Sequence, residues 1–267
     1  MSEIRQPDVL MLAGDWHGDG AWAQKAIHHA RKNHATTILQ LGDFGVWPGR
    51  DGYKYLRFVD KVLEECNIDL LVVPGNHEDY TKLGIDYVGR APFKLRAEGR
   101  TTFLPRGFRW EWWGQTWMAL GGAFSVDDFK RELGKSWWPQ EMLTDEQVWF
   151  ASRPGDVDVI VAHDCPTGVS IPGIGPNTKG GDWPLRSLAL SEQHREKIRQ
   201  VVDAVKPGLY FHGHYHCRYE SGLYLPGGDG MKVVGLDMNQ STLADNTYFL
   251  GEPRAEWEHE LMKAKAA

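Results

Sequence analysis

The sequence has little cysteine and no hydrophobic run long enough to cross a membrane. Its three cysteines, Cys66, Cys165 and Cys217, are too few and too scattered for a disulfide framework or a cysteine zinc cluster. Free thiols are typical of a reducing compartment, so we expect a cytoplasmic protein. No apolar stretch approaches the roughly 18 residues of a membrane span, and the N-terminus lacks the apolar core of a signal peptide. We therefore expect neither a membrane protein nor a secreted one.

An excess of positive charge is also missing. The chain has 30 Lys and Arg against 36 Asp and Glu, a net charge of −6, which argues against a wide nucleic-acid-binding face but leaves room for a small basic pocket. Its 267 residues, 42% of them hydrophobic, suffice for a sizeable core. With no linker-like segment, we expect a single domain over residues 1–267, in which 254–267 form a terminal helix or a loose tail.

Strand and helix patterns alternate along the first part of the chain. Apolar runs predict strands at 9–13, 36–41 and 70–73, and helical spacing predicts helices at 20–33 and 53–66, with Asp19 as an N-cap. This β-α-β-α-β order predicts parallel strands covered by helices, and so an α/β fold.

The pattern then becomes less regular. Short strand-like pieces divided by Gly and Pro at 93–121 indicate an antiparallel or mixed section. A capping box from Thr144 to Gln147 predicts a helix at 144–152. The remaining predictions are a strand at 158–162, a Gly/Pro-rich loop at 164–184, a helix at 185–205, a strand at 208–212 and two or three strands between 219 and 250.

Five strand-like runs end in residues that could bind a metal. The five segments are Gly14-Asp15-Trp16-His17-Gly18, Gly42-Asp43, Gly75-Asn76-His77-Glu78, Ala162-His163-Asp164 and Gly213-His214-Tyr215-His216. Sites in open α/β sheets gather where strands end at their carboxyl side, so we expect these segments to converge. A turn explains any one Gly-Asp, but five of the chain's 11 His fall in this ordered set.

The donor types in these segments favour a two-metal centre. His, Asp and Asn without a thiolate suit Mn²⁺, Fe or Zn²⁺. Seven candidate ligands are too many for one ion and suffice for two ions that share a carboxylate. Two ions about 3.5–4 Å apart can clamp both oxygens of an in-line phosphoryl displacement and lower the pKa of a shared water. The residues therefore favour a two-metal centre, which suits displacement at a phosphoryl group.

The order D-x-H, G-D, G-N-H-[D/E], H, G-H-x-H over Asp15 to His216 resembles the calcineurin-like metallophosphoesterases. The resemblance implies a four-layer α/β sandwich with two central mixed β-sheets flanked by helices. It also implies a role for each residue of the motif set. One ion is held by Asp15, His17, Asp43 and His216, and the second by Asp43, Asn76, His163 and His214, while His77 protonates the leaving group and Glu78 orients His77.

Departures from the family pattern concern the substrate. Protein phosphatases of the family carry Gly-Asp-x-x-Asp-Arg-Gly, whereas residues 42–49 here read GDFGVWPG, without the Asp-Arg pair. The motif set is more similar to bacterial and phage phosphodiesterases, including those that act on cyclic nucleotides. Residues 121–127 and 136–139 are similar to small enzymes of mycobacteriophages and their hosts.

Further candidates for substrate contact lie outside the motif set. Trp137 and Trp138 follow a Gly-containing turn and could stack a nucleobase, although packing is the stronger interpretation. Arg131 could donate two hydrogen bonds to a phosphate. Six basic residues against one Glu in 90–109 fit a solvated strand face as well as an oligonucleotide track. We interpret the strand-like Trp110, Trp112, Trp113 and Trp117 as core, and Cys165 and Cys217 as packing residues.

We therefore expect a phosphodiesterase with two divalent ions, Mn²⁺ first among them, acting on small or cyclic nucleotide-like esters. In this mechanism a metal-bridging hydroxide attacks phosphorus in line, and Asn76 and His77 stabilise the developing charge. One alternative is a nuclease of the same fold, for which nucleic acid would be the substrate. Another is a protein-interaction scaffold without catalysis, which the complete ligand set disfavours because buried charges without a metal are costly.

Overall fold

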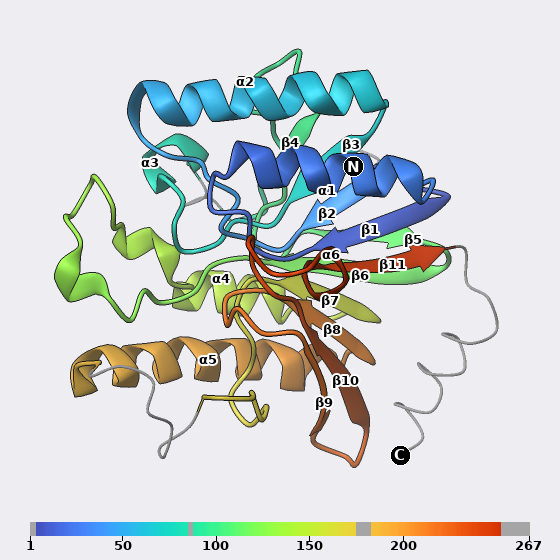
Figure 1. The fold of residues 1–267 in the computed structure, drawn as a ribbon. Helices are drawn as coiled ribbons and strands as arrows, with labels where there is room; N and C mark the ends of the chain where they lie inside the picture. Colours follow the sequence, from blue (N-terminus) through green and yellow to red (C-terminus); the bar gives the residue numbers. More distant parts are fainter. Residues whose placement is uncertain (1–3, 85–87, 175–182, 252–267) are drawn as a thin grey trace.

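Two β-sheets lie face to face, and helices cover their outer faces (Figure 1). This computed structural model describes residues 4–84, 88–174 and 183–251. The predicted four-layer α/β sandwich with two mixed sheets is confirmed. The expected terminal helix or tail at 254–267 lies outside the described residues.

The first sheet has the strand order β11-β1-β2-β3-β4. Its strands are β1 Val9–Ala13, β2 Thr37–Gln40, β3 Asp69–Val72, β4 Thr101–Phe103 and β11 Thr247–Gly251. Strands β1 to β4 run parallel, as the alternation of strand and helix patterns predicts, and β11 pairs with β1 in the antiparallel sense. The carboxyl ends of β1, β2 and β3 therefore share one edge of the sheet.

The second sheet has the strand order β5-β6-β7-β8-β10-β9. Its strands are β5 Arg109–Trp112, β6 Gln115–Leu120, β7 Val159–Ala162, β8 Leu209–His212, β9 Tyr219–Tyr224 and β10 Gly230–Gly235. The inner strands are parallel, whereas β5 and β9 are antiparallel edge strands. The mixed section predicted at 93–121 is thus divided: β4 completes the first sheet, and β5 and β6 begin the second.

Helices α1 Gly20–Lys32 and α2 Gly49–Cys66 cover the first sheet, and α4 Asp145–Ala151 and α5 Leu185–Val205 cover the second (Figure 1). Short helical turns are α3 Tyr80–Leu83, α6 Leu243–Asn246 and 3₁₀ turns at Asp128–Lys130 and Pro139–Glu141. The Asp19 cap and the Thr144–Gln147 capping box form as predicted. Among the described residues, none of the helices combines the length and the apolar character that crossing a membrane requires.

Apolar side chains fill the space between the sheets as well as beneath the helices. Trp112 and Trp117 are fully buried between the sheets, and the centroids of their rings lie 5.5 Å apart. Trp110 and Trp113 pack against them. The packing role predicted for these tryptophans is confirmed. Because the inner strands are covered on both faces, they read as continuous apolar runs: all four residues of β7 are buried.

Candidate metal centre

The five predicted segments follow β1, β2, β3, β7 and β8, all at the carboxyl ends of parallel strands. The structure brings the seven candidate ligands of these segments together in two clusters. The seven are Asp15, His17, Asp43, Asn76, His163, His214 and His216. The clusters combine residues that follow strands of both sheets.

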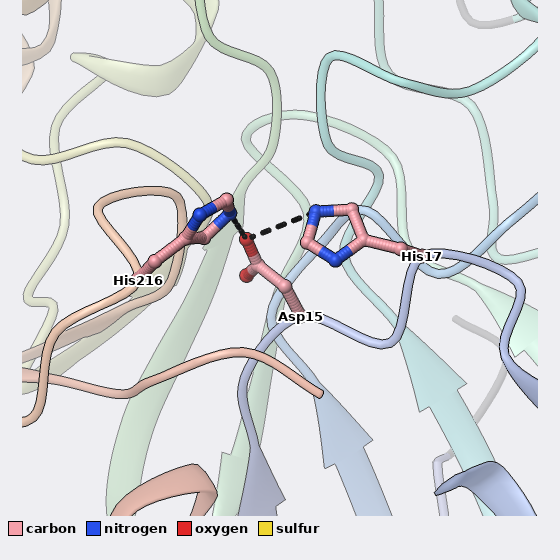
Figure 2. Close-up of side chains that lie close together, drawn as sticks. All are labelled: Asp15, His17 and His216. Carbon is pink, nitrogen blue, oxygen red and sulfur yellow. Dashed lines mark ion pairs between the residues drawn. The ribbon is translucent and has the colours of Figure 1, made fainter. Parts of the chain in front are cut away.

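The first cluster consists of Asp15, His17 and His216 (Figure 2). Oδ2 of Asp15 lies 3.1 Å from Nε2 of His216 and 3.9 Å from Nε2 of His17. The Asp15 carboxylate is fully buried, whereas the two imidazoles reach the surface. One atom from each of the three side chains falls within 4.8 Å of the others, which is close enough for a shared ion.

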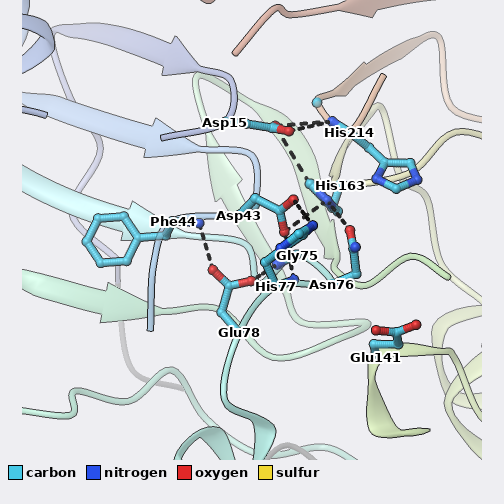
Figure 3. A network of polar contacts seen from close by, with 12 residues as sticks. Asp15, Asp43, Phe44, Gly75, Asn76, His77, Glu78, Glu141, His163 and His214 are labelled. Carbon is cyan, nitrogen blue, oxygen red and sulfur yellow. Dashed lines mark hydrogen bonds and ion pairs between the residues drawn. The ribbon is translucent and has the colours of Figure 1, made fainter. Parts of the chain in front are cut away.

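The second cluster consists of Asp43, His163 and His214, and Asn76 lies against it (Figure 3). Nε2 of His163 is 3.4 Å from Oδ1 of Asp43 and 2.9 Å from Oδ1 of Asn76. His163 is fully buried, and Asn76 is nearly so. Oδ1 of Asn76 and Nε2 of His163 therefore lie close enough together to bind the same ion.

Asp43 lies between the two clusters and faces both. Its Oδ1 is 3.4 Å from Nε2 of His163, and its Oδ2 is 3.6 Å from Nε2 of His17. The backbone N–H of His77 also donates to Oδ1 at 2.9 Å. One carboxylate oxygen is thus directed at each cluster, which is the placement that a bridging ligand requires.

The turns that carry the ligands have an unusual backbone. His17, Asp43, His214 and His216 all have φ between +47° and +68°, the left-handed region that non-glycine residues rarely occupy. Gly75 permits a close approach as well, because a Cβ there would lie 2.2 Å from the Asp43 nitrogen and 2.3 Å from its Oδ1. Such strain is typical of functional sites.

Two of the imidazoles are oriented by hydrogen bonds from the far side of the ring. Nδ1 of His163 donates to the Leu41 carbonyl at 2.8 Å, and Nδ1 of His17 lies 2.7 Å from Oδ1 of Asn239. In both rings this leaves Nε2 directed toward the carboxylates, as in a metal-ligating histidine whose other nitrogen is held by an outer partner. Sequence reasoning missed Asn239, which lies in the loop after β10 and belongs to no motif.

The charges at the centre call for a cation. Burial raises the pKa of Asp43, but the protonated imidazoles of His163 and His17 hold it well below its ordinary value. Burial lowers the pKa of His17 and of His163, but Asp43 and Asp15 raise them to about 9 and about 10. Without a metal, these two imidazoles hold protons that offset the buried carboxylates. Oxygen and imidazole donors without a thiolate fit Mn²⁺, Fe or Zn²⁺ in place of those protons.

Glu78 does not orient His77, so this prediction is wrong. Its carboxylate instead accepts hydrogen bonds from the backbone N–H groups of Phe44 at 2.6 Å, Gly45 at 3.2 Å and Gly75 at 2.9 Å (Figure 3). Glu78 therefore ties the turn after β2 to the turn after β3. Neighbouring residues in a tight turn direct their side chains apart. The order of residues in the motif does not reveal these directions.

His77 contacts Arg131 instead. Nη2 of Arg131 is 2.7 Å from Nε2 of His77, and Nε of Arg131 is 2.7 Å from Oδ1 of Asp127. Burial is the main cause that lowers the pKa of His77, and the positive charge of Arg131 adds to it. The nearby carboxylate of Asp43 raises this pKa, but burial and the positive charge outweigh it. Arg131 lies outside the motif set in the sequence, yet its side chain does reach the centre.

The two tryptophans that follow in the sequence differ in their surroundings. Trp138 is 3% exposed and belongs to the core under α1 and α2, so it cannot stack a nucleobase. Trp137 is half-buried, and its Nε1 donates to Oε1 of Glu141 at 3.0 Å. The stacking role therefore fails for Trp138 and stays a prediction for Trp137.

The basic residues at 90–109 form internal ties rather than a free track. Arg96 and Arg100 pair with Asp60 and Glu64 of α2. The other four, Arg90, Lys94, Arg106 and Arg109, donate to backbone carbonyls. Lys94 and the partner Glu64 of Arg100 are exposed to solvent, but these contacts leave no free row of cations at 90–109 for an oligonucleotide.

The two cysteines near the centre are packing residues, as predicted. Cys165 is fully buried, and burial raises the pKa of its thiol to about 12. Cys217 is half-buried, and burial also raises its pKa. Neither thiol has the lowered pKa of a nucleophile.

Asp164 is a further residue that sequence reasoning left without a role. Its fully buried carboxylate accepts hydrogen bonds from His194 of α5 at 2.9 Å and from the Tyr215 hydroxyl at 2.7 Å. Tyr215 separates His214 from His216, so Asp164 links the segment that carries two ligands to the second sheet and α5. Its neighbour His163 belongs to the predicted set of metal ligands, whereas no motif in the sequence assigns a role to Asp164.

One family model and several solved structures match this chain. The model of the calcineurin-like phosphoesterase family matches residues 6–218. A crystal structure 12% identical in sequence has a TM-score of 0.54, with 93% of this chain and 100% of that chain covered. A protein of Thermus thermophilus is 13% identical with a TM-score of 0.49 and coverages of 93% and 100%. A dimetal phosphatase from Danio rerio is 14% identical with a TM-score of 0.49 and coverages of 91% and 92%. No curated protein matches the sequence.

Proposed function

The chain belongs to the calcineurin-like phosphoesterase family and is a metal-dependent phosphoesterase, and from this premise we propose that it hydrolyses small or cyclic nucleotide-like phosphodiesters. The observation that carries the proposal is Asp43, whose two carboxylate oxygens face separate clusters of ligands. A bridged pair of ions is the arrangement suited to an in-line displacement at phosphorus. We include in the proposal a single catalytic domain and a cytoplasmic location.

Two sets of residues would hold the ions. Asp15, His17, Asp43 and His216 form the first set, and Asp43, Asn76, His163 and His214 the second. When bound, divalent ions polarise a phosphoryl oxygen and make water a stronger acid. Mn²⁺ is the ion that we propose first for this mixture of oxygen and imidazole donors, with Fe or Zn²⁺ as alternatives.

His77 and Arg131 supply the chain's own groups beside the ions. Arg131 is a permanent cation, and its side chain is held by Asp127 in a position to meet a phosphate oxygen. A phosphate that takes over these hydrogen bonds would release Nε2 of His77, which could then hold a proton for the leaving oxygen. Asn76 and His77 would also stabilise charge on the phosphoryl oxygens.

The preference for diesters rests on the segment after Asp43. Protein phosphatases of the family place an Asp-Arg pair there, whereas this chain runs through Phe44 and Trp47 into α2. The two positions of that pair are Val46, which is fully buried, and Trp47, so neither supplies a charge to a phosphate. The likeness to enzymes of mycobacteriophages and their hosts stays a prediction that points the same way.

The two alternatives have less support. A nuclease would need a basic track, and the six basic residues at 90–109 are engaged in internal ties. A scaffold without catalysis is disfavoured because it would keep buried carboxylates among imidazoles, which destabilise the fold when no metal is bound. Degradation of long single strands would favour the nuclease.

Hydrolysis of bis(p-nitrophenyl) phosphate tests the proposal. We expect turnover with Mn²⁺, loss of turnover on chelation, and recovery when Mn²⁺ is returned. Asp43→Asn should lower kcat more than His216→Ala, because the bridge serves both ions. Full activity in exhaustively chelated protein would end the two-metal interpretation. A kcat/KM on a phosphoserine peptide that equals the value on the best diester would end the diester assignment.

A further inference from the structure

A buried chain of hydrogen bonds leads away from the centre through Asn76. Nδ2 of Asn76 donates to Oγ of Ser125 at 2.9 Å, and Oγ of Ser125 donates to Oε2 of Glu141 at 2.8 Å. Asn76, Ser125 and Glu141 are 2%, 1% and 0% exposed, so bulk water cannot replace these partners. Figure 3 shows Glu141 and His163 with Asn76 between them.

Glu141 is held firmly at the outer end of this chain. Its Oε1 accepts from the Ser125 backbone N–H at 2.7 Å and from Nε1 of Trp137 at 3.0 Å. Arg106 binds the backbone carbonyl of Glu141 at 2.7 Å. The buried Glu141 carboxylate thus accepts from the hydroxyl and the backbone N–H of Ser125 and from Nε1 of Trp137. Neither the metal clusters nor the proposed reaction accounts for this arrangement.

The direction of the hydrogen bonds determines which end of the Asn76 amide faces the centre. At pH 8, the pH of the metal-binding test, the Glu141 carboxylate is ionised and can only accept, so the single hydroxyl hydrogen of Ser125 goes to Glu141. Oγ of Ser125 is then an acceptor for Asn76, and only the Nδ2 end of the amide can satisfy it. The other end, Oδ1, is therefore left facing His163 and the second cluster. An amide nitrogen has no lone pair for a metal, so a reversed amide could not be a ligand.

We propose that Ser125 and Glu141 are positioning residues that hold the Asn76 amide with Oδ1 toward the second metal position. The inference rests on the proposed function, because it concerns one ligand of the two-metal centre. The loop from 125 to 141 thereby contacts the centre twice: Ser125 and Glu141 reach Asn76, and Arg131 reaches His77.

Replacing Glu141 with Gln keeps a hydrogen bond between residue 141 and Ser125 but reverses its direction. A Gln amide in the position of Oε2 donates to Ser125, whose hydrogen must then turn to Asn76 and favour the reversed amide. Ser125→Ala removes the contact without imposing the wrong direction. The matched control is Asp60→Asn, since Asp60 of α2 is another buried carboxylate that accepts from backbone and hydroxyl donors, at Arg100 and Thr101.

The readout is metal binding at pH 8, measured as Mn²⁺ per chain, by calorimetry, and by the electron paramagnetic resonance signal of a coupled Mn²⁺ pair. We expect two ions in the wild type. Loss of an outer partner typically weakens metal affinity about 10- to 100-fold, so Glu141→Gln should weaken one site by that factor and keep the other. Ser125→Ala should have a smaller effect, and Asp60→Asn should keep both sites even where its melting temperature falls.

Each other result has a distinct meaning. Two sites of unchanged affinity in Glu141→Gln would overturn the positioning role. Equal loss at both sites, or a loss in all three variants that follows their melting temperatures, would show a merely structural tie and would also overturn it. Fewer than two ions in the wild type would instead overturn the proposed two-metal function.

Discussion

Nη2 of Arg131 lies 2.7 Å from Nε2 of His77, although 54 positions separate the two residues in the sequence. A guanidinium group only donates hydrogen bonds, so Nε2 of His77 accepts, and the imidazole is neutral with its hydrogen on Nδ1. The lowered pKa of His77, caused mainly by burial, agrees with this assignment. In the free protein, Arg131 thus occupies the nitrogen from which a proton would be delivered.

His77→Ala should reduce kcat far more on a nucleotide diester than on a nitrophenyl diester. A ribose alkoxide is a strong base that needs a proton as it leaves, whereas p-nitrophenolate needs little help. General acids contribute about 10²- to 10⁴-fold, and we expect a loss of this size on the nucleotide diester. Both rates should be measured together with metal content, which should stay near the wild-type value. An equal loss on both substrates would contradict the general-acid role, and a lower metal content would make His77 a ligand.

Arg131→Ala should raise the pKa of His77, because it removes both a positive charge and the donor to Nε2. An NMR titration of the metal-free protein would follow this shift. The same variant should lose about 10- to 100-fold in kcat/KM on diesters, since hydrogen bonds to charged groups contribute about 1.5–3 kcal/mol. Lys130→Ala is the control, because Lys130 packs over the rings of Phe129 and Trp183. An unchanged His77 titration in Arg131→Ala would contradict the contact.

Asp164→Asn should lower the free energy of unfolding by about 3 kcal/mol, because it weakens buried hydrogen bonds to His194 and Tyr215. The pKa of Asp164 is lowered in the folded protein: burial raises it, but the hydrogen bond from His194 and the nearby positive charges outweigh that effect. Its stabilisation is therefore fully present above the ordinary pKa of 3.8 and is lost as the pH falls below it. Urea unfolding at pH 7 and pH 3 would measure both effects.

The control for Asp164 is Glu192→Gln, because Glu192 pairs with Arg195 through a carboxylate that is 44% exposed. Exposed pairs contribute about 1 kcal/mol or less, so this variant should change little. If Asp164→Asn proves no more destabilising than the control, the buried pair does not stabilise the fold.

Glu141→Gln should change how stability depends on pH. Burial raises the pKa of Glu141 to about 7, against an ordinary value of 4.5. A carboxyl whose pKa is raised by folding stabilises the fold fully below pH 4.5, and this contribution is lost as the pH rises through 7. Between pH 4.5 and 8, the wild type should therefore lose about 3 kcal/mol relative to Glu141→Gln. Parallel stability curves for the two proteins over this range would contradict the raised pKa.

The sequence by itself predicted the parallel strands, the main helices and the segments that carry the ligands. These features depend on local signals: apolar runs, helical spacing, a capping box, and polar residues placed directly after strands. The topology of parallel strands then brings Asp15, Asp43 and Asn76 to one edge without further information. The clustering of the seven candidate ligands therefore followed from patterns only a few residues long.

Only the tertiary structure decided which side chains touch. The Glu78 side chain binds backbone N–H groups rather than its neighbour His77, and the Arg131 side chain contacts His77 instead. The tertiary structure also placed Trp138 in the core and Asn239 behind His17. These contacts depend on how loops from different strands pack and on the direction of each side chain from its turn. Residues adjacent in the sequence can face apart and distant ones can meet, because the chain's path through both sheets, rather than spacing along it, determines the distance between them.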